Sequence, residues 1–304
     1  MRSAVLITGA SRGFGRCLAE DFVREISSGD LDLHLWARHE QDLQETERLA
    51  RDAWTSRQSD AAATGMLRTF LAVVDLSDKD DYAPKIDAVL TQLQAESYQR
   101  IYLVHNAGSL GELGFTQEWS SHEMLDQYWH FNVHSVLWFN KRYTDLLWLV
   151  VLRFLEVFGA SREELKSAAS LTNGSEAQTQ KPQSVIINIT SLCGIEPFET
   201  HGLYCMGKAA REMHHRVLAK EQAPCGPRVR VLQYSPGPMD TDMQTTIRES
   251  PGVLEALAKS YGEMKANGTL IPPAKSSRLG VKLALSGEFE TGAHVDYYDI
   301  APKE

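Results

Sequence analysis

The sequence has few cysteines and no pattern that would pair them or bind zinc with them. Its four cysteines, Cys17, Cys193, Cys205 and Cys225, show no CxxC spacing and no nearby histidines arranged as zinc sites require. The first residues also lack the basic, apolar and cleavage-site segments of an export signal. We therefore expect a cytoplasmic protein with reduced thiols and no metal site.

The sequence also lacks a long hydrophobic run and an excess of basic residues. Its most apolar stretch, residues 146–158, is interrupted by Arg153 and Glu156 and is shorter than the roughly 20 residues that cross a bilayer. Lys and Arg number 31 against 40 Asp and Glu, which gives a net charge of -9. We expect neither a nucleic acid nor a membrane as partner. An anionic ligand must then be held locally, by a helix N-terminus or by arginines.

Short runs rich in Val, Ile and Leu alternate with longer segments of helical spacing along the 304 residues. This alternation predicts an α/β fold of the Rossmann type, with one doubly wound parallel sheet of about seven strands and helices on both faces. Ligands of such sheets bind at the carboxyl ends of the strands. The predicted strands are 4–8, 32–36, 68–74, 101–105, 184–190, 229–234 and 293–295. The predicted helices are 13–26, 40–54, 80–94, 120–133, 135–158, 204–221 and 274–286.

Two segments depart from the alternation. Residues 159–183 are polar with few large apolar side chains, so we interpret them as a surface insertion. Residues 235–273 contain several prolines and glycines around a predicted helix at 253–265, and they follow a strand end, so we interpret them as a substrate lid. The chain is otherwise expected to form one domain, residues 1–304.

A glycine-rich loop follows the first predicted strand and opens the first predicted helix, in the sequence Thr8-Gly9-Ala10-Ser11-Arg12-Gly13-Phe14-Gly15. Glycines in this position allow a tight turn and a close approach of the backbone to a pyrophosphate at the helix N-terminus. The loop therefore predicts a dinucleotide site.

The TGxxxGxG spacing of this loop resembles the short-chain dehydrogenase/reductase family. The resemblance implies NADPH/NADP as the cofactor, because the second strand ends in Arg38 where NAD-preferring members carry an acidic residue. Arg12 would complete a clamp on the 2′-phosphate, although Arg38 could also be a solvated arginine that leads a helix. The implied cofactor-binding residues are Gly9, Ser11, Arg12, Gly13, Phe14, Gly15, Arg38, Asp75, Leu76, Asn106, Ala107, Gly108, Tyr204, Lys208, Pro236, Gly237 and Thr241. Asp75 and Thr241 could instead be helix caps.

Tyr204 and Lys208 are spaced i, i+4, so both project from one face of the predicted helix. A tyrosine titrates near ~10 in water and needs a nearby cation to become more acidic, and Lys208 can supply that cation. Ser191 precedes Tyr204 by the separation found in the family's Ser-Tyr-Lys triad. The resemblance implies that Tyr204 protonates the carbonyl oxygen, Ser191 binds that oxygen and Lys208 binds the nicotinamide ribose. Asn132 matches a fourth catalytic position, which kinks a helix and holds a water.

Longer stretches, such as residues 236–243 and 292–299, resemble the branch of the family that reduces 6-acyl pterins. This implies a substrate site of Ser191, Tyr204 and Asp296, whose carboxylate would accept two adjacent N–H groups of a pterin. Asp296 could instead be a turn residue at a strand end. Animal members of this branch carry a tryptophan where this chain has His201, which we place at the pocket rim. The family resemblance also implies a homodimer.

Three functions are compatible with these residues. The first is NADPH-dependent reduction of the side-chain ketone of a 6-acyl pterin, as in tetrahydrobiopterin-type biosynthesis. The second is reduction of non-pterin dicarbonyls or aromatic ketones, which the change at His201 favours. The third is a non-catalytic protein that senses NADP(H), which the presence of Ser191, Tyr204, Lys208 and Asn132 disfavours.

Overall fold

The computed structural model describes residues 1–57, 65–158, 184–223 and 228–302. The predicted insertion 159–183 and Cys225 lie outside these ranges. Within the described residues, no helix is both long and apolar enough to cross a membrane.

Seven parallel strands form one sheet in the order β3-β2-β1-β4-β5-β6-β7. The predicted α/β Rossmann-type fold is therefore confirmed, and every predicted strand is present within about two residues of its expected bounds. Ser235 and Asp296 are register partners where β6 meets β7, so the last strand brings Asp296 to the carboxyl end of the sheet. The strands are β1 (Arg2–Thr8), β2 (Asp30–Ala37), β3 (Leu67–Val73), β4 (Arg100–His105), β5 (Ser184–Ile189), β6 (Val229–Ser235) and β7 (His294–Asp296).

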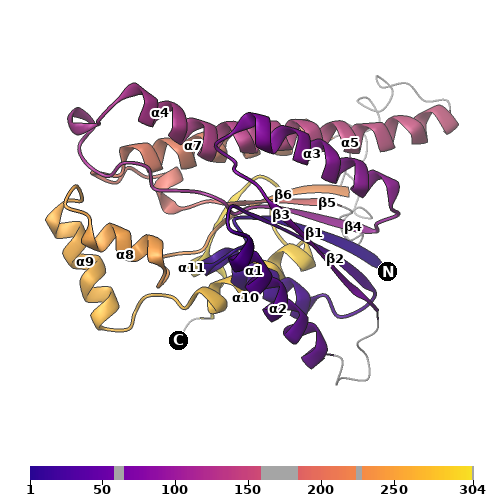
Figure 1. Ribbon diagram of the computed structural model, residues 1–304, viewed down its shortest axis with the longest axis horizontal. Coiled ribbons are helices and arrows are strands. Elements are labelled where there is room, and N and C mark those ends of the chain that lie inside the picture. The colour runs from indigo at the N-terminus through magenta and orange to yellow at the C-terminus, as the bar shows by residue number, and fades with distance from the viewer. Residues whose placement is uncertain (58–64, 159–183, 224–227, 303–304) are drawn as a thin grey trace.

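Helices cover both faces of the sheet, as the sequence predicts (Figure 1). One face carries α1 (Gly13–Glu25), α2 (Glu40–Arg57) and α10 (Pro273–Ser286). The other carries α3 (Lys79–Ala95), α5 (Ser135–Phe158) and α7 (Gly202–Gln222), with α4 (His122–Trp129) and the π-helix η2 (His130–His134) leading into α5.

The core has two layers because successive strand residues point to opposite faces of the sheet. In β1, Val5 and Ile7 pack on the α1 side, while Ala4 and Leu6 pack on the α5 side. Strand β5 is buried along its whole length. Such continuous burial is typical of a central strand in a parallel sheet covered on both faces.

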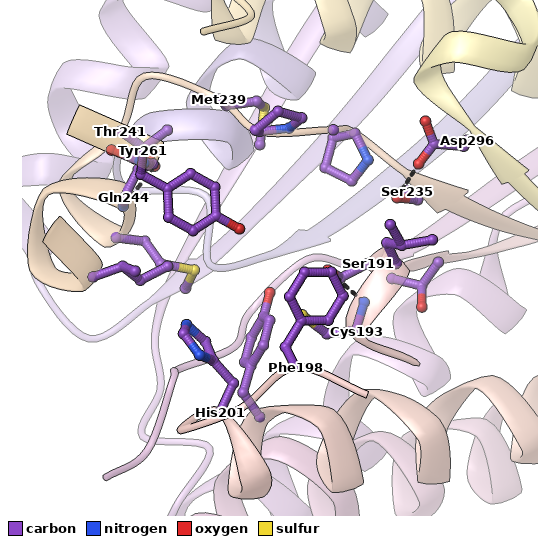
Figure 2. Close-up of a pocket in the computed structure, with 18 of the residues that line it drawn as sticks. Ser191, Cys193, Phe198, His201, Ser235, Met239, Thr241, Gln244, Tyr261 and Asp296 are labelled. Atoms are coloured by element: carbon purple, nitrogen blue, oxygen red, sulfur yellow. Dashed lines mark hydrogen bonds between the residues drawn. The ribbon is translucent and has the colours of Figure 1, made fainter. Parts of the chain in front are cut away.

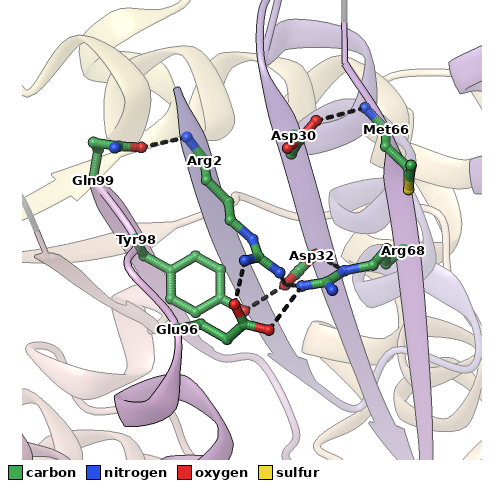
Figure 3. A network of polar contacts seen from close by, with 8 residues as sticks. All are labelled: Arg2, Asp30, Asp32, Met66, Arg68, Glu96, Tyr98 and Gln99. Atoms are coloured by element: carbon green, nitrogen blue, oxygen red, sulfur yellow. Dashed lines mark hydrogen bonds and ion pairs between the residues drawn. The ribbon is translucent and has the colours of Figure 1, made fainter.

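A polar network lies at the amino ends of the strands, at the opposite edge from the carboxyl ends (Figure 3). The buried carboxylate of Asp32 accepts hydrogen bonds from Arg2 at 3.1 Å, from Arg68 at 2.7 Å and from the Tyr98 hydroxyl. Glu96 pairs with both arginines. Burial raises the pKa of Asp32, although Tyr98 and Arg2 act in the opposite direction. The network joins β1, β2 and β3 and is remote from the strand ends where ligands bind.

Two helices project beyond the carboxyl ends of the strands, within the predicted lid (Figure 1). They are α8 (Asp242–Glu249) and α9 (Glu255–Ala266). Helix α9 matches the predicted helix 253–265, whereas α8 was not predicted. Thr241 is the N-cap of α8, where its side chain accepts from the Gln244 backbone N–H. The short elements are η1 (Thr116–Glu118), η3 (Leu192–Gly194) and α11 (Tyr297–Ile300).

Candidate active site

The glycine-rich loop turns sharply between β1 and α1. Gly9 and Gly13 have φ of 68° and 54°, a region that L side chains avoid. A Cβ at Gly15 would meet the carbonyl oxygen of Gly9 at 2.1 Å, so only glycine fits there. The Asn106 amide donates to the carbonyls of Thr8 and Gly9 at 3.0 Å each and holds the loop against β4.

A cleft runs from this loop across the carboxyl ends of β2, β4 and β5, and we call it the dinucleotide cleft. A Cβ at Gly13 would meet nothing within 4 Å, so the loop leaves open space for a phosphate at the N-terminus of α1. The cleft therefore fits a dinucleotide. The predicted cofactor residues that line it are Gly9, Ser11, Arg12, Gly13, Phe14, Gly15, Arg38, Leu76, Asn106, Ala107, Gly108, Tyr204, Lys208, Pro236 and Thr241.

Two predicted cofactor residues do not line this cleft. The Asp75 carboxylate turns back to accept from the backbone N–H and hydroxyl of Ser77 at 2.9 and 2.6 Å. It is not the cap of the next helix either, because Asp78 caps α3. Gly237, with φ of 74°, lines the neighbouring pocket instead.

The two arginines predicted to bind a 2′-phosphate both line the dinucleotide cleft, but their guanidinium groups contact different partners. The Arg38 guanidinium lies 5.9 Å from the centre of the Phe131 ring. Arg12 pairs with Asp242 of α8 at 2.9 Å, and both side chains are exposed. The glycine-rich loop is thus joined to α8 through an exposed ion pair.

Tyr204, Lys208 and Ser191 meet near the carboxyl end of β5. The Lys208 ammonium donates to the carbonyl of Ile189 at 2.8 Å and lies 5.5 Å from the centre of the Tyr204 ring. The Ser191 hydroxyl accepts from the Cys193 backbone N–H at 3.2 Å and caps η3. The predicted triad is thus gathered at one place.

In the protein without a cofactor, Lys208 is not among the groups that lower the pKa of Tyr204. Burial raises the pKa of Tyr204, while the Ser191 hydroxyl and the Arg211 cation act to lower it. Burial, followed by repulsion from Arg211, lowers the pKa of Lys208 well below its usual value. An amine that is buried beside a second cation loses its proton more easily, so it stabilises a nearby tyrosinate less than an exposed lysine would. Tyr204 therefore stays protonated, which is the form that can donate a proton.

Asn132 lies in the π-helix η2, where the chain departs from α-helical geometry, and its side chain is fully engaged. Its amide donates to the Ser109 hydroxyl at 3.0 Å and to the Tyr128 carbonyl at 3.1 Å. Its oxygen accepts from the Ser109 backbone N–H at 2.8 Å. The side chain thereby fixes the loop after the Asn106 motif, and its part in a water relay stays a prediction.

A second cavity of about 460 Å³, which we call the substrate pocket, lies between the strand ends and helices α8 and α9 (Figure 2). This volume is in the range of small-molecule sites. Tyr204 lines both this pocket and the dinucleotide cleft, so its hydroxyl can reach a group bound between them. The apolar lining includes Leu192, Phe198, Met239, Met243, Ile247 and Tyr261, and the polar lining includes Ser191, His201, Gln244 and Asp296.

The sequence left two roles open for Asp296, a substrate-binding carboxylate and a turn residue at a strand end, and its place in the structure is compatible with both. Its carboxylate accepts from the Ser235 hydroxyl at 2.6 Å and from the Tyr298 backbone N–H at 3.0 Å, which caps α11. It also lines the substrate pocket. The capping box of α11 adds a third hydrogen bond to this carboxylate, from the Asp299 backbone N–H, so one of its about four acceptor positions remains for a ligand.

His201 is not at the pocket rim as predicted, because it is only 2% exposed and forms part of the buried wall. It precedes the first residue of α7 as the N-cap position, and its backbone bridges to Gly114. No group of three or more His, Cys, Asp and Glu side chains within the described ranges could hold a metal ion.

Comparison with known proteins decides the family. A model described as short chain dehydrogenase matches residues 3–148 and 165–252. The chain belongs to the short-chain dehydrogenase/reductase family. It is an oxidoreductase, and this family uses nicotinamide cofactors. Sepiapterin reductase from Bos taurus is 33% identical over 301 residues, which cover 98% of this chain and 95% of that protein.

More distant relatives share the fold. Benzil reductase ((S)-benzoin forming) from Bacillus subtilis (strain 168) is 23% identical over 245 residues, covering 81% of this chain and 78% of that protein. Among solved structures, the KRED1-Pglu enzyme superposes with a TM-score of 0.70 at 21% identity, covering 97% of this chain and 100% of that one.

Arg211 is a residue of this oxidoreductase that the sequence did not single out. It is 1% exposed on α7, and its guanidinium donates to the Asn188 amide oxygen at 2.9 Å and to the carbonyls of Ala107 at 2.9 Å and His105 at 2.5 Å. It therefore joins α7 to the ends of β4 and β5. The one sequence signal for this position is that Arg211 follows Lys208 by three residues, which places both on the same side of α7.

Proposed function

We propose that this oxidoreductase uses NADPH to reduce the side-chain ketone of sepiapterin or a related 6-acyl pterin, as in tetrahydrobiopterin-type biosynthesis. The observation that carries the proposal is the position of Tyr204, which lines both the dinucleotide cleft and a pocket with the Asp296 carboxylate in its wall. Relatives at 33% identity over nearly the full chain support the choice of substrate.

The chain's own residues perform the proton chemistry. A bound nicotinamide supplies the hydride. Tyr204 donates its phenolic proton to the carbonyl oxygen, and Ser191 holds that oxygen by a hydrogen bond as negative charge develops on it. Lys208, fixed on the Ile189 carbonyl, lies beside the tyrosine ring where it can bind the nicotinamide ribose. Apolar side chains such as Phe198 and Met243 limit the access of water.

Selectivity for NADPH is assigned to Arg38 and Arg12. Strand β2 leads into Arg38 and carries no carboxylate at this point for a ribose 2′-hydroxyl. Arg12 would exchange Asp242 for the phosphate, which carries more charge and accepts two parallel hydrogen bonds. Replacing Arg38 with alanine should lower kcat/KM for NADPH at least tenfold and leave that for NADH unchanged. Equal losses with both cofactors would contradict the assignment.

The pterin anchor is tested by replacing Asp296 with asparagine, which retains a helix cap but loses the charge. We expect the KM for sepiapterin to rise at least tenfold, since the charge-assisted hydrogen bond to the pterin weakens. The KM for a small diketone should not change. Ser235→Ala is the control, because it removes the neighbouring hydroxyl and keeps the carboxylate. A sepiapterin KM unchanged by Asp296→Asn would remove the anchor.

A second candidate function is the reduction of non-pterin diketones or aromatic ketones. The benzil reductase relatives and the mainly apolar lining of the pocket favour it. Steady-state rates with NADPH for sepiapterin and for benzil separate the two. Turnover of benzil without turnover of sepiapterin would replace the first candidate by the second.

We also propose that the protein is a homodimer that pairs through α5 and α7. Three large apolar side chains are exposed there, Trp138 at 41%, Met213 at 57% and Val217 at 44%. Exposed apolar groups of this kind mark protein interfaces when they gather on one surface. Light scattering should give twice the monomer mass for the natural protein and the monomer mass for Val217→Glu. A monomeric natural protein would refute the pairing.

A further inference from the structure

Two buried polar side chains of the substrate pocket have atoms without a hydrogen-bond partner among the described residues. They are the Nε2 atom of His201 and both terminal atoms of the Gln244 amide. His201 is 2% exposed and Gln244 is 5% exposed. Buried polar groups in proteins are nearly always paired, so two unpaired groups in one pocket wall point to a ligand that completes them.

The hydrogen-bonding character of His201 follows from its other ring nitrogen. The Nδ1 atom lies 3.0 Å from the carbonyl oxygen of Glu199, and a carbonyl can only accept. Nδ1 therefore carries the hydrogen, and in the neutral imidazole Nε2 is an acceptor. A ligand group that pairs with Nε2 must supply a hydrogen.

Gln244 offers the complementary partner. Its backbone is fixed in the first turn of α8 through the Thr241 cap, while its amide has a donor and an acceptor free. A hydroxyl can donate to His201 and accept from Gln244 at the same time.

His201 and Gln244 line the same pocket as Tyr204, the residue that we expect to protonate the carbonyl oxygen. His201 is the N-cap position of α7 and Tyr204 lies in the first turn of that helix, and both line the substrate pocket. In Figure 2, Gln244 and Tyr261 lie on one side of the pocket, and Asp296 and Ser235 lie on the other. A ligand with its ring at Asp296 and its ketone at Tyr204 would extend its side chain toward Gln244.

We propose that His201 and Gln244 form a hydroxyl-binding subsite that selects ketones with a hydroxyl on the carbon next to the carbonyl. This inference rests on the proposed function and adds to it the part of the substrate beyond the ketone. Sepiapterin has such a hydroxyl in its side chain, whereas benzil has none.

The test compares ketones that differ only in this hydroxyl. One pair is sepiapterin and its 6-propanoyl analogue, and the other is 2-hydroxypropiophenone and propiophenone, all with NADPH. For each pair, the measurement is the ratio of kcat/KM with the hydroxyl to kcat/KM without it. We expect a ratio of about ten or more, the effect of one good hydrogen bond.

His201→Phe and Gln244→Met keep the shape of the wall and remove its polar atoms. Each should reduce the ratio about tenfold. Because both side chains bind one group, the double variant should lose no more than either single variant. His122→Phe, a change at an exposed histidine outside the pocket lining, is the matched control and should leave the ratio unchanged.

The outcomes separate this inference from the proposed function. A ratio near one in the natural protein, or a ratio that survives both variants, overturns the subsite and leaves the reductase function standing. Turnover of the aromatic pair alone overturns the pterin function, and its ratio still decides the subsite. Failure to reduce any of the four ketones overturns both proposals.

Discussion

Replacement of Arg211 by methionine tests how the buried guanidinium supports the site. The change removes three donors and leaves the Ala107 and His105 carbonyls and the Asn188 amide oxygen without them. Hydrogen bonds from a charged donor contribute roughly 1.5–3 kcal/mol each to stability. Methionine also removes the cost of burying a charge, which is several kcal/mol. We therefore expect the free energy of unfolding to fall by a net of about 2–4 kcal/mol. Burial lowers the pKa of Arg211 to about 10, so the side chain is still charged at neutral pH.

Urea unfolding at pH 7 measures this loss, and NADPH titration measures its effect on the cofactor site. The NADPH dissociation constant should rise because Ala107 lines the dinucleotide cleft and loses its support. Arg211→Lys should recover only part of the stability, since an ammonium cannot bind three acceptors in the same fork. Arg48→Met, a change at an exposed arginine of α2 on the other face of the sheet, is the control. Natural stability and natural NADPH affinity in Arg211→Met would refute this reasoning.

Three further predictions concern titratable groups. Burial acts to lower the pKa of His294, but its hydrogen bond with Glu212 at 3.1 Å outweighs this and raises the pKa. The pair should therefore stabilise the fold fully below the unfolded pKa of ~6.5 and lose this effect as pH rises through the higher folded pKa. His294→Gln should flatten the pH dependence of urea unfolding between these two pKa values, and an unchanged profile would contradict the assignment. Cys193 lowers the pKa of Cys205, so alkylation of Cys205 by iodoacetamide, followed by mass spectrometry, should set in at lower pH than for an ordinary thiol, and Cys193→Ala should move that rise to higher pH. Equal rates in both proteins would speak against the shift. Tyr204→Phe should reduce carbonyl turnover at least ~100-fold and retain NADPH binding by fluorescence, and residual turnover near the natural rate would exclude Tyr204 as the proton donor.

The strands and most helices could be predicted because their signals are local. Strand β5, Ser184–Ile189, is a continuous apolar run between polar segments, and such runs are typical of central parallel strands. Helix α8 was missed because Asp242–Glu249 is short and polar and follows a segment rich in proline. Thr241, its N-cap, was recognised as a possible cap, and its contact with a nicotinamide remains a prediction.

The site could be predicted only where spacing along the chain carries the information. The glycine-rich loop and the Tyr204–Lys208 pair have fixed spacing in the sequence, and the fold brings them to one cleft. Arg211 acts through partners far away in the chain, and Gln244 was noticed only because its amide is buried and unpaired, neither of which a local pattern reports. The predicted effect of Lys208 on the pKa of Tyr204 was wrong for the protein alone, because spacing does not reveal that the ammonium is buried beside another cation.

The ion pair between Arg12 and Asp242 has a consequence for how the dinucleotide cleft opens. Both side chains are exposed, so the pair contributes less than ~1 kcal/mol, and salt weakens it further. The glycine-rich loop and helix α8 are thus held together by a contact that thermal fluctuation breaks easily. Raising the ionic strength therefore frees the Arg12 guanidinium from Asp242 before any phosphate has arrived to compete for it.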